Sequence, residues 1–207
     1  MPFSKLMFWL QNMFSKGNKP FALGLYGTVN TGKSTLANRI CMDWCGEKIS
    51  ESSEVPHETR TVKKREKIEM NIKGRKLTIN LLDMPGITTK VDYREFMEFG
   101  FKKDQAQQRA KEATKGIIEA IKWLDNVDVA LVVMDACEDP YTQVNLTILG
   151  NLEARKIPFI VVANKIDKKS SKPDKLREAF PQHDVVEISA LDGTNVNKLY
   201  ESIARKI

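Results

Sequence analysis

The sequence of 207 residues contains few cysteines and histidines and no long apolar run. Three cysteines, Cys41, Cys45 and Cys137, are an odd number without the spacing of a metal knuckle, which favours a reducing compartment over a disulfide framework. With only His57 and His183 to complete a ligand set, we expect no zinc site. No segment approaches the roughly 18 apolar residues of a membrane span, and the N-terminus lacks the cleavage site of a secretory signal. We therefore expect a cytoplasmic protein.

The remaining composition is that of one ordinary domain with its own core. Hydrophobic residues make up 42% of the chain and aromatic residues 8%, which excludes a disordered or fibrous protein. The formal net charge of +6 permits an anionic partner such as RNA or lipid headgroups but does not require one. Composition leaves the oligomeric state open.

The first 19 residues differ from the rest of the chain. Phe3, Leu6, Leu10 and Phe14 recur at helical spacing, and a Gly-Asn-Lys-Pro sequence at 17–20 then breaks the pattern. We expect an amphipathic helix with its linker over residues 1–19 and a second unit over residues 20–207.

Short apolar runs alternate with helical patterns from residue 20 onward. The runs predict strands over residues 21–26, 61–72, 76–82, 129–134, 159–163 and 185–188. Helical spacing predicts helices over residues 33–44, 106–124 and 195–207, with a shorter aromatic-rich segment over 93–101. Because the runs at 129–134 and 159–163 do not alternate, both of their faces should be covered. The predicted fold is α/β, a mostly parallel central sheet of about six strands flanked by helices.

A phosphate-binding pattern follows the first predicted strand. The pattern G-x-x-x-x-G-K-[ST] is met from Gly27 to Ser34, where backbone N–H groups and a helix N-terminus can cradle phosphates. Lys33 would reach the β- and γ-phosphates, and Ser34 would ligate Mg²⁺. The predicted nucleotide-binding residues here are Gly27, Thr28, Val29, Asn30, Thr31, Gly32, Lys33, Ser34 and Thr35. A chance glycine-rich turn is the alternative, which the strand before it and the helix after it disfavour.

A second motif, D-x-P-G, stands at the carboxyl end of the strand predicted over 76–82. Asp83 would hold the Mg²⁺ shell there, and the Gly86 N–H would touch the γ-phosphate. By itself this tetrapeptide is also a common turn sequence.

Base recognition is predicted at two further strand ends. The carboxylate of Asp167 can accept from the N1–H and N2–H₂ groups of guanine, a donor pair that adenine lacks. Lys165 can lie along the base and ribose, and Asn164 can tie this loop to the phosphate loop. The residues Ser189, Ala190 and Leu191 offer a backbone N–H to the guanine oxygen. A solvated turn is the alternative for both segments.

These motifs together resemble those of the translation-factor-like small GTPases, in particular the Era, EngA and TrmE group, over residues 20–207. The resemblance implies the G-domain fold, GTP hydrolysis and a catalytic set of Lys33, Gly86 and a switch threonine. Thr59 matches the threonine that contacts Mg²⁺ and the γ-phosphate, with Thr61 as the alternative, because Glu58 replaces the family's usual threonine.

Two residues bear on the implied hydrolysis. Ile87 stands where many regulatory GTPases carry a water-positioning Gln. Asn30 matches the asparagine with which potassium-activated members of the group hold K⁺ beside the phosphates, and it would join the catalytic set. The alternative is that Asn30 only stabilises the turn.

The target of such a switch is left open between two classes. One is RNA or the ribosome, as the resemblance implies and as the Lys/Arg-rich residues 60–76 would allow, although these also fit a solvated edge strand. The other is a peripheral membrane surface or a protein partner, docked through residues 1–16. Because the resemblance covers residues 20–207 and not the RNA-binding domain of Era, we do not expect it to transfer the targets of its relatives.

Overall fold

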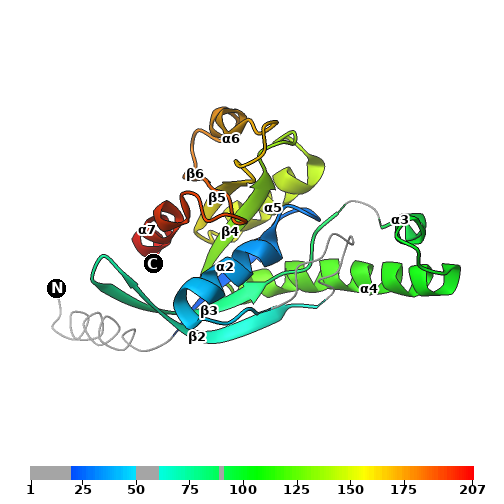
Figure 1. The fold of residues 1–207 in the computed structure, drawn as a ribbon, viewed down its shortest axis with the longest axis horizontal. Helices are drawn as coiled ribbons and strands as arrows, with labels where there is room; N and C mark the ends of the chain where they lie inside the picture. Colours follow the sequence, from blue (N-terminus) through cyan, green and yellow to red (C-terminus); the bar gives the residue numbers. More distant parts are fainter. Residues whose placement is uncertain (1–19, 50–60, 89–90) are drawn as a thin grey trace, which may run out of the picture.

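The computed structural model describes residues 20–49, 61–88 and 91–207, which form a sheet with helices on both faces (Figure 1). The strands are β1 (Phe21–Tyr26), β2 (Lys63–Ile72), β3 (Arg75–Asp83), β4 (Val129–Asp135), β5 (Phe159–Asn164) and β6 (Val185–Glu187). The helices are α2 (Lys33–Cys45), α3 (Tyr93–Glu98), α4 (Lys103–Lys122), the 3₁₀ turn η2 (Trp123–Asn126), α5 (Gln143–Ala154), α6 (Pro173–Ala179) and α7 (Val196–Lys206).

The six strands lie in the order β2-β3-β1-β4-β5-β6. All neighbours pair in parallel except β2, which pairs antiparallel with β3 and forms one edge of the sheet. The predicted α/β fold with about six mostly parallel strands is confirmed. Each predicted strand is present with ends within two residues of those expected.

The core consists of two layers, one on each face of the sheet. On β4, Leu131 and Val133 face α2 and α7, whereas Val132 and Met134 face the side of α5 and α6. Because both faces are covered, the strand is apolar at every position, as its unalternating sequence indicates.

Two helices, α5 and α6, were not singled out from the sequence, and α4 begins at Lys103, before the expected residue 106. The aromatic-rich segment forms α3, whose Phe96 is fully buried against Ala106 and Ala113 of α4. Together α3 and the first half of α4 extend beyond the end of the sheet (Figure 1).

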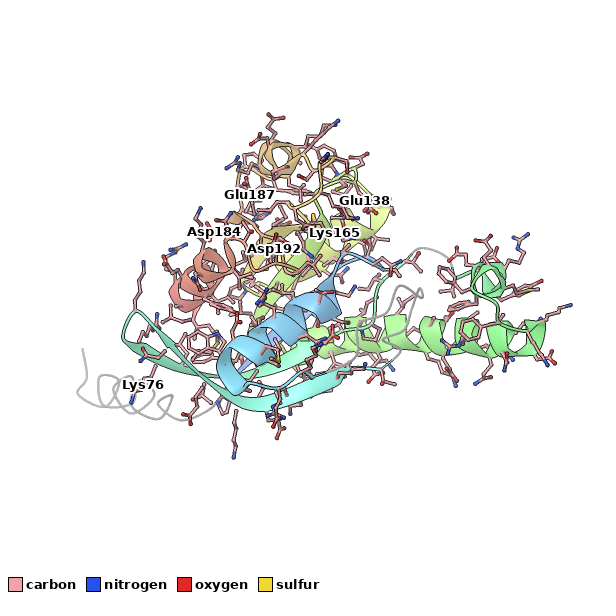
Figure 2. All side chains as sticks on the ribbon, viewed as in Figure 1. Lys76, Glu138, Lys165, Asp184, Glu187 and Asp192 are labelled. Atoms are coloured by element: carbon pink, nitrogen blue, oxygen red, sulfur yellow. The ribbon has the colours of Figure 1, made fainter. Side chains whose placement is uncertain are left out.

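Where the structure describes them, the Lys/Arg-rich residues 60–76 lie on the edge strand β2, the turn that follows it and the start of β3. Several of their cations are paired, since Lys64 contacts Glu66, Arg65 contacts Glu47 and Lys73 contacts Glu201. Lys76 stands at the far side of the molecule from Lys165 (Figure 2). These contacts favour the interpretation of a charged, protected sheet edge.

Residues 1–19 lie outside the described residues, so the amphipathic helix and its docking role stay predictions. Within the described ranges, no helix combines the length and the apolar character needed to cross a membrane.

Candidate nucleotide-binding site

The phosphate loop between β1 and α2 encloses its own lysine. The Lys33 ammonium is buried and donates hydrogen bonds to the carbonyl oxygens of Gly27 (3.2 Å) and Thr28 (2.6 Å). Burial lowers the pKa of Lys33 to about 8, and the nearby Asp83 carboxylate acts in the opposite direction. A buried cation held beside the loop backbone by two carbonyl groups suits a multiply charged anion such as a polyphosphate.

Ser34 and Asp83 meet beside this lysine. The Ser34 hydroxyl donates to Oδ2 of Asp83 at 2.7 Å, while Oδ1 of Asp83 is buried without a hydrogen-bond partner among the described residues. Burial raises the pKa of Asp83, and the Ser34 hydroxyl and Lys33 partly offset this effect. A buried carboxylate oxygen with an unused lone pair, next to a hydroxyl, fits an oxygen-preferring cation such as Mg²⁺.

The segment after Asp83 lies directly against the phosphate loop. A Cβ at Gly86 would lie 3.0 Å from the Val29 Cα, so only glycine permits this approach without a shift of the loop. The Ile87 N–H donates to the Gly27 carbonyl, and the Ile87 side chain is 7% exposed within the core. Ile87 therefore anchors the segment to the phosphate loop through its backbone and packs its apolar side chain in the core.

Asn164 links three loops through its side chain. Its Nδ2 donates to the Thr31 carbonyl at 2.8 Å, and its Oδ1 accepts from the Ala190 N–H at 2.9 Å. A Cβ at Gly32, where φ is +93°, would lie 2.3 Å from this Nδ2, so the second glycine of the loop leaves room for the clamp. The structure thus brings the phosphate loop next to the loops at the ends of β5 and β6.

Lys165 is held by a residue that sequence reasoning missed. Its ammonium contacts Oδ2 of Asp135 at 2.6 Å, at the adjacent carboxyl end of β4. Although burial acts to raise it, the pKa of Asp135 is lowered by Lys165 and by the Cys137 N–H. Asp135 ends an apolar strand, as Asp83 does, and this shared position is the signal that could have found it.

The remaining residues predicted to recognise the base differ in exposure, since Asp167 and Leu191 are exposed and Ser189 and Ala190 are buried. Asp167 is exposed two residues beyond Lys165, which adopts the left-handed conformation with φ of 68°. The loop from Ser189 closes on itself, since the Ser189 N–H donates to the Thr194 carbonyl and the Gly193 N–H donates to the Ser189 carbonyl. Because Asp167 is exposed, its carboxylate can accept hydrogen bonds from a base that binds from solvent.

The switch threonine is not placed by the structure. Thr59 lies outside the described residues, and Thr61, which is described, is exposed. The assignment of Thr59, with Thr61 as the alternative, stays a prediction.

Sequence comparison agrees with this arrangement of loops. The family model described as "50S ribosome-binding GTPase" matches residues 22–165, more than half of the chain. The chain belongs to this GTPase family. The match covers the phosphate loop, the Asp83 segment and the start of the Asn164 segment.

Known members of the family have similar sequences and folds. GTPase Era of Clostridium acetobutylicum is 31% identical over 192 residues, which span 88% of this chain and 54% of that Era. GTPase Der of Campylobacter hominis is 26% identical, with 90% of this chain and 36% of that Der covered. The chain thus spans about half or less of the length of these relatives. The predicted resemblance to the Era group is confirmed.

Solved structures of Era have the same fold. A variant of Aquifex aeolicus Era bound to GDP and AlF₄⁻ superposes with a TM-score of 0.70 at 26% identity, over 92% of this chain and 57% of that one. Era in complex with MgGDPNP and a segment of 16S ribosomal RNA superposes with a TM-score of 0.68 at 27% identity, over 91% and 57%.

Proposed function

We propose that this protein binds GTP with Mg²⁺ and hydrolyses it to GDP and phosphate, acting as a nucleotide-dependent switch. The observation that carries the proposal is the Asn164 clamp, which joins the phosphate loop at Thr31 to the base loop at Ala190. A site built in this way binds the phosphates and the base of one molecule together. Residues 20–207 form the GTP-binding domain in this proposal, and residues 1–19 are an appendage.

Guanine is the base that the exposed carboxylate selects. Asp167 accepts from N1–H and N2–H₂, while an amide of the Ser189–Leu191 loop donates to O6. Adenine presents neither the donor pair nor this acceptor, so ATP leaves the carboxylate unpaired and binds poorly.

Ser34 and Asp83 are the described residues that would hold Mg²⁺, with Thr59 as the third proposed ligand. The unpartnered Oδ1 of Asp83 supports this assignment. When bound, the metal neutralises charge that develops on the β- and γ-phosphate oxygens. Lys33 contributes a second positive charge at the same oxygens, and the Gly86 N–H supplies a hydrogen bond that only a γ-phosphate can accept.

The switch property follows from the path of the chain after β3. Gly86 lies against Val29 of the phosphate loop, and the α3–α4 pair begins six residues after Ile87. A γ-phosphate at Gly86 would therefore be sensed by a segment that leads directly into a projecting pair of helices.

The partner that we propose for the switch is ribosomal RNA or the ribosome. The family description and the complex of Era with 16S ribosomal RNA support this choice. The projecting α3–α4 pair offers a rigid element for such contact.

The test is phosphate release from GTP and from ATP by the purified full chain with Mg²⁺, with co-sedimentation on ribosomal subunits or on liposomes. We expect slow release from GTP, none above background from ATP, and more protein on ribosomal subunits with a non-hydrolysable GTP analogue than with GDP. Equal turnover of ATP would contradict the base assignment, and nucleotide-dependent binding to liposomes alone would contradict the ribosomal partner.

A monovalent cation is proposed to assist hydrolysis at Asn30. With Ile87 buried in the core, the side chain that most often orients the attacking water is absent, and K⁺ held by Asn30 would stabilise charge in the transition state. Turnover in KCl should exceed turnover in NaCl at equal ionic strength by about hundredfold, the lower end of the effect of one preorganised contact to charge that develops in the transition state.

The matched variant for this prediction is Asn30→Gly. Asn30 has a φ of 63°, so glycine keeps the left-handed turn and removes only the amide. The variant should bind GDP as the wild type does and turn over at the same rate in both salts. Equal wild-type rates in KCl and NaCl would show that Asn30 serves only the turn.

A further inference from the structure

A side chain of α2 reaches the loop that follows β6. Arg39 donates from Nη2 to the carbonyl oxygen of Leu191 at 3.2 Å. At Gly193, where φ is +90°, an added Cβ would lie 2.9 Å from the same Nη2. The guanidinium therefore packs against the backbone of the loop. Arg39 itself belongs to none of the predicted nucleotide-binding motifs.

Arg39 is in turn oriented by a partly exposed ion pair. Its Nη1 lies 3.7 Å from Oδ1 of Asp43, one turn along α2. The other oxygen of Asp43 accepts from the Tyr200 hydroxyl at 2.6 Å, and the Tyr200 side chain is 4% exposed on α7. Trp44 packs edge-on against the Tyr200 ring with 5.5 Å between ring centroids. Tyr200 is thus held by packing as well as by its hydrogen bond.

These contacts join one short loop, and the helix that follows it, to α2. The loop begins at Ser189 and leads into α7 at Val196, so Arg39 holds its middle and Asp43 holds the helix that follows it. On the other side, Asn164 restrains the loop at Ala190. Because the Leu191 side chain is 74% exposed, packing of that side chain does little to fix the loop, and the restraint at the carbonyl matters more.

We propose that Arg39 is a positioning residue for guanine recognition, because its bond to the Leu191 carbonyl holds the loop so that the Leu191 N–H donates to O6 of the base. The other two amides of this tripeptide already donate within the protein, Ser189 to the Thr194 carbonyl and Ala190 to Asn164. This inference rests on the proposed GTP-binding function and adds a specificity-determining residue to it. The bond increases affinity through preorganisation, because the loop already has its ligand-binding conformation before the base binds.

The test compares two ligands that differ only at position 6. In 6-thio-GDP a sulfur, which is a weaker acceptor, replaces O6, while the donors for Asp167 are unchanged. Arg39→Gln should weaken GDP binding about tenfold, the size of one lost hydrogen bond and its ordering. The same variant should weaken 6-thio-GDP binding by less than about threefold, since sulfur at position 6 gains little from the Leu191 N–H.

Arg155→Gln is the matched control. Arg155 also forms an ion pair with an aspartate, Asp125, and its side chain is 35% exposed against 28% for Arg39. Both ligands should bind this variant as they bind the wild type. Tyr200→Phe removes only the hydroxyl that holds Asp43, and it should give a smaller loss of affinity that is again selective for GDP. If Arg39→Gln does not fold, the comparison of the two ligands is made with Tyr200→Phe.

An equal loss for both ligands in Arg39→Gln, or no loss for GDP, would overturn the positioning role. Failure of the wild type to bind GDP at all would overturn the proposed function, and with it this inference. The two failures are distinguished because the second is seen without any substitution.

Discussion

Lys33→Ala is expected to weaken GTP binding at least about hundredfold, because each charge-assisted contact to a phosphate contributes roughly 1.5–3 kcal/mol. The ammonium already lies inside the phosphate loop, 2.6 Å from the Thr28 carbonyl, so it meets a bound nucleotide without a large rearrangement. GTP should lose more affinity than GDP, since the lysine reaches the γ- as well as the β-phosphate. Titration calorimetry with both nucleotides measures the difference.

The fold should survive this substitution. The variant loses two hydrogen bonds to carbonyl groups but also removes a charge whose burial is unfavourable, so the free energy of unfolding should stay within about 1 kcal/mol. Lys76→Ala, at the far side of the molecule from the base loop, is the control and should bind both nucleotides normally (Figure 2). Unchanged GTP affinity in Lys33→Ala would show that the loop is only a turn.

The positions of the site residues were predictable because the motifs stand at strand ends. In a parallel sheet the carboxyl ends of the strands lie along one edge, so an apolar run followed by Asp83 or Asn164 already places that side chain at the site. The same reasoning would have reached Asp135, which ends β4 and pairs with Lys165. It was missed because no motif marks a lone aspartate.

Arg39 could not be found in this way. It lies in the middle of α2, and its partner is a backbone carbonyl more than 150 residues along the chain. A helix pattern shows only that position 39 is polar, and the contact exists because α2 and the base loop pack on the same side of the sheet. Helix α5 was missed for a different reason, because it buries Val144, Ile148 and Leu149 in a short, mostly apolar sequence that lacks a clear polar face.

Asp167→Asn is expected to reverse the base preference of the protein. The carboxylate accepts two donors from guanine, whereas an amide offers one donor and one acceptor. Guanine would then set its N2–H₂ group against the amide N–H₂ group, and GTP affinity should fall by about hundredfold or more, as for a site that leaves polar groups unpaired. Xanthine carries a carbonyl at position 2, which accepts from the same amide, so XTP should bind the variant more tightly than GTP does.

Competition between GTP and XTP, for the wild type and for Asp167→Asn, measures this reversal directly. Asp174→Asn, an equally conservative change at an exposed aspartate of α6, should keep the preference for GTP. Because Asp167 is exposed on its turn, the substitution should leave the phosphate loop and the Asn164 clamp intact, so phosphate contacts are the same for both ligands. A variant that loses XTP and GTP in equal measure would mean that Asp167 supports the loop and does not read the base.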